Sequence, residues 1–404
     1  MSLITLQKTG GLSGKYLKGV SDFIVWYARD SESVKYRQLL SIKKAGAGDN
    51  PGKRYDQLEL ENGVRRALSK EEKLDISKTP NNSKIYQLTD LTSISSDDKT
   101  DDKYEFQGKL YFPPSNRHWS TKLLGRNRLE ICRRIVSTGK RLMFVRYLSD
   151  FPAFEISNIW DEFAVTPDVR YVVQTHPGII ARCILMTTDP GDLVLDPTCG
   201  SGTTAYVAEQ WGRRWITLDT SRVALALARA RIMGARYPYY LLADSLEGQR
   251  KEAELTRSQP SSQLTRGNIK HGFVYERVPH ITLKAIANNA EIDVIWDKFQ
   301  EKLEPLREQL NTTLVGWAEQ REAQQQDASN VGHRSRSAQP TAAFKPFEEW
   351  EIPREADDQW PDAAKKLHAD WWKHRIARQQ EIDASIAAKA DHEYLYDKPS
   401  LPLS

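Results

Sequence analysis

The sequence predicts an α/β fold built around a Rossmann-like nucleotide-binding sheet, and three observations predict it. An apolar run, residues 193–195, leads into a turn that carries Gly200 and Gly202. A helix-like segment, residues 203–210, follows the turn. A second strand-like run then ends on Asp219, close to where a ribose-binding acid is expected after such a turn. This order of strand, glycine turn, helix and acid is typical of α/β proteins that hold a nucleotide-like ligand.

The residues around the turn narrow the class of ligand. No Lys lies in the turn, so it is not a phosphate-binding P-loop. Gly200, Gly202 and Ala205 formally fit the G-x-G-x-x-A dinucleotide fingerprint, and a dinucleotide-dependent oxidoreductase is therefore one hypothesis. Asp196 weighs against it, because a carboxylate at the end of the first strand would repel a pyrophosphate. The same carboxylate suits a ligand with an ammonium or sulfonium charge.

The pattern D-P-x-x-G-S-G-T, residues 196–203, resembles the cofactor motif of the amino-group DNA methyltransferases, the N-4/N-6 DNA methylase family. In that family the glycine turn holds the methionine part of S-adenosyl-L-methionine, and the acid after the second strand holds the ribose hydroxyls. A segment like that around His176 walls the methionine pocket, and an acid like Asp244, after a third strand at 239–243, contacts the adenine. The resemblance thus implies a cofactor site made of Asp196, Pro197, Thr198, Gly200, Ser201, Gly202, Thr203, Asp219, His176 and Asp244.

The amino-acid composition limits the class of protein further. With 39% apolar and 28% charged residues the chain is globular, and no apolar run reaches the length of a membrane span. Its three cysteines have neither the spacing of a metal site nor that of a disulfide framework. We therefore expect no metal, no membrane partner and a reducing, cytoplasmic location.

Four regions follow from the patterning and the resemblance. Residues 1–44 are expected to form the late hairpin of the methyltransferase sheet, with strands at 3–7 and 20–28. Residues 45–150 are expected to be an insertion that contains the target-recognition region. Within it, residues 45–103 are expected to be a solvated connector or a variable insertion, and residues 104–112 a hairpin. Residues 151–250 form the cofactor half. Residues 251–404 are expected to be a mostly helical extension, with helices at 292–327 and 362–390, a linker at 329–340 and no clear terminal element.

Residues 116–146 carry nine Lys or Arg side chains against one acid, Glu130, with aromatic residues interleaved. This mix is typical of a surface that binds a phosphate backbone, so double-stranded DNA is the expected partner. The alternative is a helix face whose arginines form ion pairs within the protein. Residues 113–119 also resemble part of the target-recognition region of Type III-like modification enzymes. The candidate DNA-binding residues are Arg117, His118, Trp119, Lys122, Arg126, Arg128, Arg133 and Arg134.

The family's catalytic motif, [DNS]-P-P-[YFW], is not found in this sequence, so no catalytic residue is assigned. In the β-type order of motifs it precedes the cofactor motif. We therefore expect an N-terminally shortened chain, or one half of a split enzyme that works with an upstream catalytic half or a restriction subunit. The resemblance implies methylation of the exocyclic amino group of adenine in DNA. The alternative is a non-catalytic DNA-binding remnant or subunit.

Overall fold

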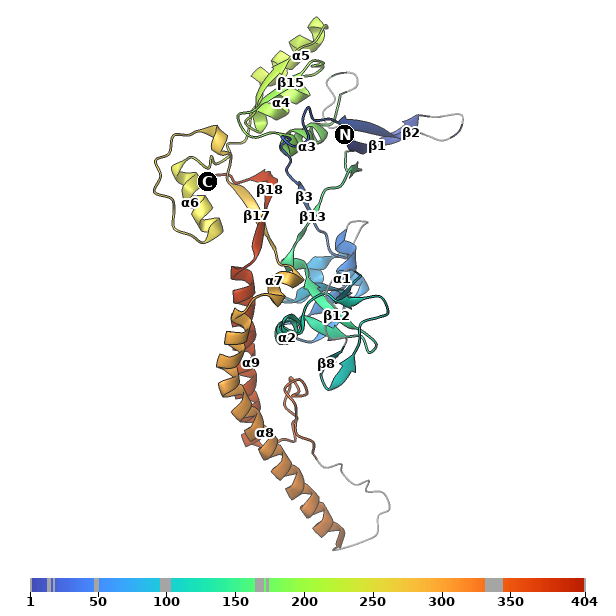
Figure 1. Ribbon diagram of the computed structural model, residues 1–404, viewed down its shortest axis with the longest axis vertical. Coiled ribbons are helices and arrows are strands. Elements are labelled where there is room, and N and C mark those ends of the chain that lie inside the picture. Colours follow the sequence, from blue (N-terminus) through green and yellow to red (C-terminus); the bar gives the residue numbers. More distant parts are fainter. Residues whose placement is uncertain are drawn as a thin grey trace. The chain divides into compact units, whose positions relative to one another are not determined.

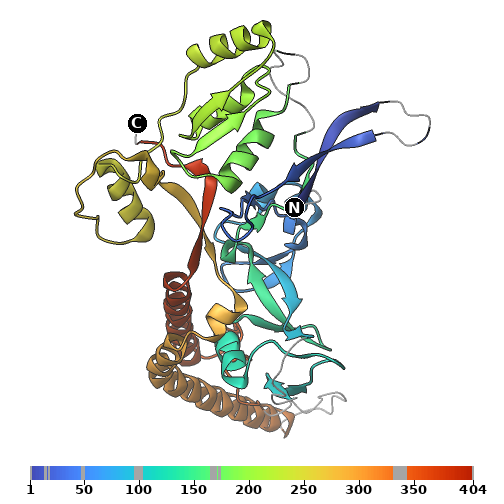
Figure 2. The same cartoon turned by 45° about the horizontal axis from the view of Figure 1, so that its top comes forward.

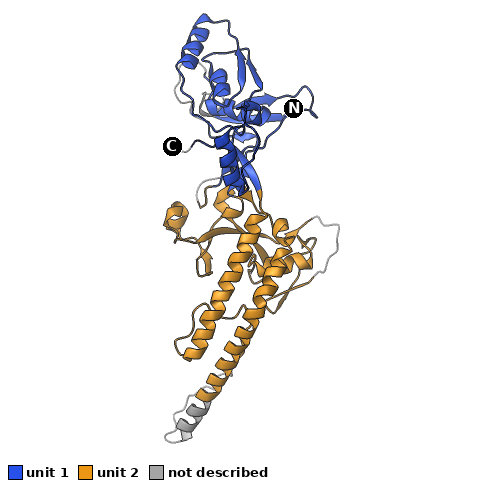
Figure 3. Cartoon of the chain, turned by 90° about the vertical axis from the view of Figure 1, so that its left-hand side faces the viewer, with its two compact units in different colours: residues 1–43, 152–278, 392–404 blue, residues 44–151, 279–391 orange. Residues whose placement is uncertain are grey.

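The computed structural model describes residues 2–12, 16, 19–46, 51–94, 103–163, 171, 174–330 and 344–402 (Figure 1). The chain forms two compact units, each made from separate stretches of sequence (Figure 3). Unit 1 contains residues 1–43, 152–278 and 392–404, and unit 2 contains residues 44–151 and 279–391.

Unit 1 begins with the hairpin that the sequence predicts. Strands β1 (Ser2–Leu12) and β2 (Gly19–Trp26) pair antiparallel, and β14 (Ile159–Trp160) runs parallel to β1. Alternation along β1 places Ile4 and Leu6 on one face. Both side chains are buried in a cluster with Ile179 of helix α3 (Pro177–Thr187).

The predicted nucleotide-binding elements are also present in unit 1. Strands β15 (Leu193–Asp196) and β16 (Arg214–Thr217) are parallel neighbours, as a strand–helix–strand crossover requires (Figure 2, green). Helix α4 (Thr203–Gln210) lies between them in sequence, and α5 (Arg222–Met233) follows β16. One face of the pair, Val194 and Trp215, packs against a cluster that contains Leu185 of α3 and Val207 of α4. This arrangement confirms the predicted α/β fold.

The opposite face of the parallel pair is apolar and exposed. Its side chains retain between 49% and 61% of their accessible surface. Parallel strands are normally covered on both faces, because their crossover helices pack on both sides of the sheet. A solvent-facing apolar surface on such strands is therefore unusual. We call this surface the apolar face; it consists of Leu193, Leu195, Ile216 and Leu218.

The remaining elements of unit 1 correct two expectations. The third strand predicted at 239–243 is an extended segment with a single bridge, Leu242 to Phe273. Its backbone bonds with residues 272–274 and Ser400 instead of extending the parallel pair. The carboxyl-terminal region ends in a strand, where the sequence indicated no clear terminal element. The other elements are β3 (Leu40–Ile42), β13 (Ala153–Glu155), α6 (Leu246–Thr256), β17 (Tyr275–His280) and β18 (Asp391–Pro399), with β3 paired to β13 and β17 to β18.

Unit 2 contains a five-stranded antiparallel sheet, so residues 45–103 are not a solvated connector, and the alternative of a variable insertion stays a prediction. Three of its strands come from that stretch, and Leu58 and Tyr86 are buried in the core. The predicted hairpin at 104–112 is confirmed as β8 (Tyr104–Phe106) and β9 (Lys109–Tyr111). In sheet order the five strands are β11 (Ile135–Ser137), β12 (Leu142–Tyr147), β6 (Lys84–Asp90), β4 (Gln57–Glu59) and β5 (Arg65–Ala67); α1 (Lys70–Leu74), β7 (Thr92–Ser93) and β10 (His118–Trp119) complete this part.

Helices complete unit 2, and both long helices predicted in the carboxyl-terminal region are present. They are α8 (Glu291–Asn330) and α9 (Asp362–Ala388), which pack side by side (Figures 1 and 3). Leu129, Ile292 and Ile386 share one buried cluster, so sequence-distant parts build one core. The shorter helices are α2 (Leu123–Ile131) and α7 (Leu283–Ala287).

Residues 331–340, which make up most of the predicted linker, lie outside the described residues. Within the described residues, the helices lack the combination of length and apolarity that crossing a bilayer would demand.

Candidate functional site

The turn after β15 is pinned to the end of β16. The Gly200 N–H donates to Asp219 Oδ2 at 2.9 Å, and the Cys199 N–H donates to the Leu218 carbonyl at 2.7 Å. The two parallel strands therefore bring Asp196 and Asp219, predicted from separate parts of the motif, to the same edge of the sheet. In open α/β sheets, ligands bind at this carboxyl edge.

Asp219 is a charged group with acceptor capacity to spare. Its Oδ1 accepts from the Ser221 N–H at 2.8 Å, and Ser221 in turn caps helix α5. Backbone hydrogen bonds from Ser221 and then Gly200 hold the pKa of the Asp219 carboxyl below its usual range. A carboxylate has about four lone-pair sites, so two backbone bonds leave room for ligand hydroxyl groups. Asp196 accepts a bond from the Thr198 N–H at 2.9 Å, which shapes the first residues of the turn.

Gly202 is needed where the turn enters α4. It is the N-cap residue of that helix and has a φ of +76°, in the left-handed region that favours glycine. A Cβ atom at this position would lie 2.8 Å from the Ala228 Cβ of α5. Both the backbone conformation and the close approach of α5 therefore require glycine. No side chain caps α4, so its first N–H groups receive no bond from the cap residue.

Ser201 and Thr203 are buried and help to hold the turn together. Arg231 Nη1 donates to Thr203 Oγ1 at 3.0 Å and approaches Ser201 Oγ at 3.3 Å. The sequence reasoning did not identify Arg231. The sequence did contain a signal for it. Arg231 lies three residues after Ala228 on α5, and residues at this spacing share a helix face, so both face the glycine turn.

Tyr171 is a second residue that the sequence reasoning did not single out. A Cβ atom on Gly200 would lie 3.7 Å from Tyr171 Cδ1, so this ring stands beside the glycine turn. Pro197 and Thr198, by contrast, are exposed on the turn itself. The accessible part of the candidate site is thus Pro197, Thr198 and the half-buried Gly200, with Asp219 beside them.

The contacts of His176 define a local structural role. Its Nδ1 accepts from the Gly178 N–H at 2.9 Å as the N-cap of α3, and its ring lies 4.9 Å from that of Phe163. Burial lowers the pKa of His176. As a contact to the cofactor, this residue remains a prediction.

Protonation of His176 is expected to remove this cap as the pH falls. The folded state favours the neutral ring, so the cap is complete above the ordinary histidine pKa of about 6.5. Its contribution should decline as the pH drops below that value and level off below the folded-state pKa. The loss should be at most about 1 kcal/mol in the free energy of unfolding, the usual value of an N-cap. Denaturant unfolding at pH 7.5 and 5.0 would measure it. H176N, with a cap that does not titrate, should show less of the decline.

The structure corrects the assignment of Asp244. Its carboxylate oxygens accept from the backbone N–H groups of Arg266, at 3.2 Å, and Asn268, at 2.8 Å. It lines a separate cavity bounded by residues of 243–271. The reason is that the segment before Asp244 bonds with residues 272–274 and Ser400 and does not add a third strand to β15 and β16.

Half of the predicted DNA-binding residues are buried in unit 2, which corrects that part of the prediction. Arg134 forms two hydrogen bonds with Asp150, and Arg128 binds Asp293 through Nε and Nη2. Arg126 is fully buried over the rings of Tyr104 and Trp119. Arg126 and Arg128 hold α2 to the core, Arg134 holds the segment after it to Asp150, and these buried groups cannot reach a phosphate. The corrected residues are Trp119, Arg126, Arg128 and Arg134.

The other four predicted DNA-binding residues retain accessible surface. Arg117 pairs with Asp90 at 3.0 Å, and Arg133 donates to the Gly63 carbonyl at 2.9 Å. His118 is half-buried in β10, and Lys122 is exposed at the start of α2. Their contact with DNA remains a prediction.

Arg134→Met is expected to destabilise unit 2 by about 3–5 kcal/mol, because it leaves the buried Asp150 carboxylate without its partner. Thermal unfolding followed by circular dichroism would measure the loss. The double variant R134M/D150N removes both charges and should recover part of the stability. An R134M protein as stable as the wild type would contradict a structural role for this pair.

Comparison with known proteins identifies the class to which this site belongs. Residues 2–230 match the family described as DNA methylase, and this match covers more than half of the chain. The chain belongs to the DNA methylase family. This membership confirms the recognition made from the D-P-x-x-G-S-G-T motif and favours a methylase over a dinucleotide-dependent oxidoreductase.

Individual relatives are similar over shorter stretches. The chain is 30% identical over 141 residues to the Type II methyltransferase M.EcaI of Enterobacter cloacae, covering 33% of this chain and 30% of that protein. It is 35% identical over 83 residues to the DNA adenine methyltransferase YhdJ of Escherichia coli, covering 19% and 27%. It thus spans under one third of the length of these curated relatives. The crystal structure of an M1.HpyAVI–SAM complex is similar at 20% identity, over 22% of this chain and 48% of that one, with a TM-score of 0.18.

The described residues contain no group of three or more His, Cys, Asp or Glu side chains arranged to hold a metal ion.

Proposed function

We propose that this chain binds S-adenosyl-L-methionine at the turn between β15 and α4, as part of an enzyme that methylates the exocyclic amino group of adenine in double-stranded DNA. The observation that carries the proposal is the bond from the Gly200 N–H to Asp219. It fixes a charged carboxylate beside a glycine turn in a chain of the DNA methylase family. Adenine is preferred as the target because a relative, YhdJ, is named a DNA adenine methyltransferase.

The residues of the turn fit this cofactor. Asp219 has free acceptor sites for a pair of ribose hydroxyl groups, and the Asp196 carboxylate suits the positive charges of the methionine part. Gly200, with a φ of +51°, lets the backbone turn sharply in the left-handed region that favours glycine, beside the ring of Tyr171. When bound, the cofactor supplies a methyl group on a positively charged sulfur. The role of this chain would be to orient that donor, with Arg231 holding the turn in place.

Calorimetric titration with S-adenosyl-L-methionine tests the proposal. We expect binding to the full chain with a stoichiometry of one. A chain with the expected helix and strand content by circular dichroism, but without binding, would overturn the cofactor assignment.

We infer that the apolar face binds a second polypeptide, one that carries a D-P-P-aromatic motif and the strands next to it. Three observations support this partner. The face is exposed, the strands have apolar residues on both sides, and β15 and β16 pair only with each other among the described residues. A strand added at an edge would satisfy the open backbone groups, and helices from the same partner would cover the face.

Such a partner has a clear chemical task. Methylation requires the adenine to leave the duplex stack, at a cost of a few kcal/mol. The amino nitrogen then needs acceptors for its hydrogens, and an aromatic ring to stack on the base, which a D-P-P-aromatic motif supplies. Co-expression with a candidate polypeptide that carries a D-P-P-aromatic motif and its strands is the test. We expect a complex that methylates DNA with labelled cofactor. A polypeptide of this kind that neither binds this chain nor restores methylation would contradict the inference.

A further inference from the structure

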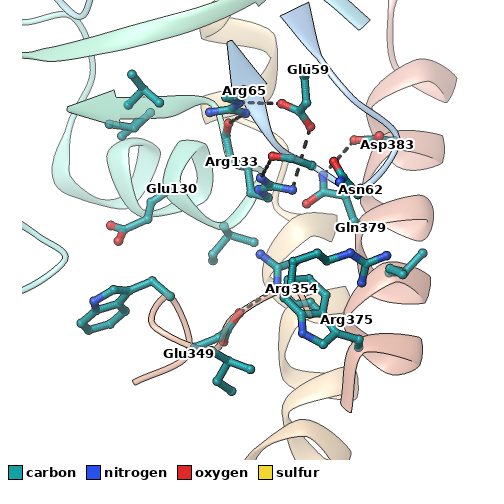
Figure 4. A pocket seen from close by; sticks show the side chains of 18 of the residues that line it. Glu59, Asn62, Arg65, Glu130, Arg133, Glu349, Arg354, Arg375, Gln379 and Asp383 are labelled. Carbon is teal, nitrogen blue, oxygen red and sulfur yellow. Dashed lines mark hydrogen bonds and ion pairs between the residues drawn. The ribbon is translucent and has the colours of Figure 1, made fainter. Parts of the chain in front are cut away.

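The arginines that line the large cavity of unit 2 include two that hold its walls together. The cavity has a volume of about 1450 Å³ (Figure 4). Arg65 of β5 binds Glu59 of β4 at 2.6 Å, and Arg375 of α9 binds Glu349, which precedes α9, at 3.0 Å. Each guanidinium group thus meets a carboxylate from another segment of the cavity wall. These two arginines therefore have a structural role.

Arg231 of α5 has partners of a different kind, which belong to the predicted cofactor site. Its Nη1 atom donates to Thr203 Oγ1 at 3.0 Å and to Ser201 Oγ at 3.3 Å. Both hydroxyl groups belong to buried residues, and they also bond to each other at 3.1 Å. Because buried hydroxyl groups are costly to leave without partners, the donor on Arg231 helps to fix the conformation of the glycine turn.

A second contact fixes the direction of the Arg231 side chain. Its guanidinium carbon lies 4.8 Å from the centre of the Tyr206 ring, a distance at which a cation and an aromatic ring attract each other. Tyr206 follows Thr203 by three residues, so the two lie on one face of α4. The Tyr206 ring is in turn 5.2 Å from that of Tyr237, which follows α5. Arg231 therefore joins α5 to the first turn of α4 at two points.

The charge of Arg231 is not placed where it would favour α4 itself. The amino end of a helix carries a partial positive charge, so a cation there is unfavourable. Arg231 nevertheless approaches Thr203, the first residue of α4. The stability of this helix alone does not explain an arginine at the position. A role in the site that the turn builds is the better explanation.

The glycine turn is thus held by two residues of one continuous segment, which runs from the end of β16 through α5. At its start, Asp219 accepts from the Gly200 N–H at 2.9 Å. Asp219 also accepts from the Ser221 N–H at 2.8 Å, and Ser221 caps the helix that carries Arg231. One support therefore acts on the turn itself, and the other acts on its junction with α4.

We propose that Arg231 is a positioning residue of the cofactor site. Through Ser201 and Thr203 it holds the turn in the conformation that receives the methionine part of S-adenosyl-L-methionine, whereas Asp219 serves the ribose. This inference rests on the proposed function, because it takes that cofactor as the ligand. Arg231 needs no contact with the cofactor for this role, since it acts through the turn.

Calorimetric titration of the full chain with two ligands tests the proposal. The first ligand is S-adenosyl-L-methionine, and the second is 5′-methylthioadenosine, which keeps the nucleoside and the sulfur but lacks the amino-acid end. Arg231→Met removes the donor and keeps an unbranched side chain that suits a helix. We expect it to weaken the binding of S-adenosyl-L-methionine by about tenfold, the effect of one lost hydrogen bond. Binding of 5′-methylthioadenosine should weaken by no more than about twofold, because the support by Asp219 is independent of Arg231.

Two variants serve as controls. Arg231→Lys keeps a donor and should bind the cofactor within about threefold of wild type. Arg229→Met makes the same change at an exposed position two residues earlier on α5, and should bind both ligands within about twofold of wild type. Circular dichroism would verify that each variant is folded.

Thr203→Val tests the path through which Arg231 acts. The change removes the acceptor of the 3.0 Å bond and keeps a side chain of similar shape. In the Thr203→Val background, most of the effect of Arg231→Met should vanish, because the effects of residues in contact are not additive. Losses that simply add in the double variant would overturn action through this hydroxyl group.

The outcomes separate this inference from the proposed function. A folded wild-type chain that does not bind S-adenosyl-L-methionine would overturn both. Wild-type binding with an unchanged affinity in Arg231→Met would overturn the positioning role alone. Equal losses for the two ligands would also overturn it, because the residue would then support the whole site and not the methionine part. If Arg231→Met fails to fold, Thr203→Val decides: a loss for S-adenosyl-L-methionine that exceeds the loss for 5′-methylthioadenosine supports the role, and an unchanged affinity overturns it.

Discussion

Asp219→Ala is expected to weaken the binding of S-adenosyl-L-methionine by at least about 100-fold. The carboxylate would make charge-assisted hydrogen bonds with the ligand, each contributing about 1.5–3 kcal/mol. The change also frees the Gly200 N–H, which now donates to Asp219 at 2.9 Å, so the turn would lose its anchor to β16. Calorimetry or equilibrium dialysis with labelled cofactor would measure the effect.

Asp192 provides a matched control for this experiment. It lies just before β15, where its carboxylate pairs with Lys35 at 2.7 Å. Asp192→Ala should bind the cofactor within about a factor of two of wild type, because the residue is at the opposite end of the strand from the turn. The Asp219→Ala variant should retain DNA binding. If the complex with Asp219→Ala still methylated DNA, the cofactor assignment to this chain would be wrong. The alternative, that this chain only binds DNA and takes no part in methyl transfer, would then gain support.

The double variant Leu195→Asp/Ile216→Asp is expected to have the second large effect, on aggregation of the isolated chain and on association with the inferred partner. Both side chains lie on the apolar face and are largely exposed, so their replacement should change the melting temperature of the isolated chain only slightly. It should lower the binding of a hydrophobic dye and delay aggregation, because a large exposed apolar surface is removed. In the complex with the inferred partner the same change should weaken association by about 100-fold or more. Burying a charge without a partner costs several kcal/mol.

Leu264→Asp supplies the comparison for these measurements. Leu264 belongs to unit 1, is 89% exposed and lies outside the apolar face. It should leave dye binding, aggregation and partner affinity close to those of wild type. Equal behaviour of the two variants would show that the apolar face is ordinary surface.

The segment from 193 to 219 could be predicted from the sequence because its signals are local. Short apolar runs and the two glycines of the turn each have a short-range physical cause. The structure places β15 and α4 within one residue of the predicted bounds. The bond between Gly200 and Asp219 follows from these elements, since parallel strands bring their carboxyl ends together.

The basic stretch, residues 116–146, shows why the roles of its arginines could not be predicted from the sequence. Arg128 binds Asp293, which is 165 residues away in sequence, and Arg134 binds Asp150, which is 16 away. A count of charges along the chain cannot detect such partners, so buried arginines look the same as surface ones. The hypothesis of internal ion pairs, considered beside DNA binding, was right for these two residues.

The position of Asp244 could not be predicted from the sequence for a different reason. The apolar run before it has the composition of a strand, but the backbone partners of Leu241 are Val274 and Ser400. Strand propensity reflects packing against neighbours more than a preference of the chain itself. The composition of this run was thus compatible both with a third strand beside the parallel pair and with the observed pairing. Only the tertiary fold selected between them.

The interleaving of the two units has a consequence for how unit 2 can change in evolution. Leu129, from the first segment of unit 2, and Ile292 and Ile386, from the second, pack in one cluster. A gene exchange that replaced residues 44–151 alone would set foreign side chains against the old helices and leave cavities or clashes. We therefore expect the two segments to be inherited together. A chimaera that carries unit 2 of a relative should fold only when both segments, 44–151 and 279–391, are transplanted together.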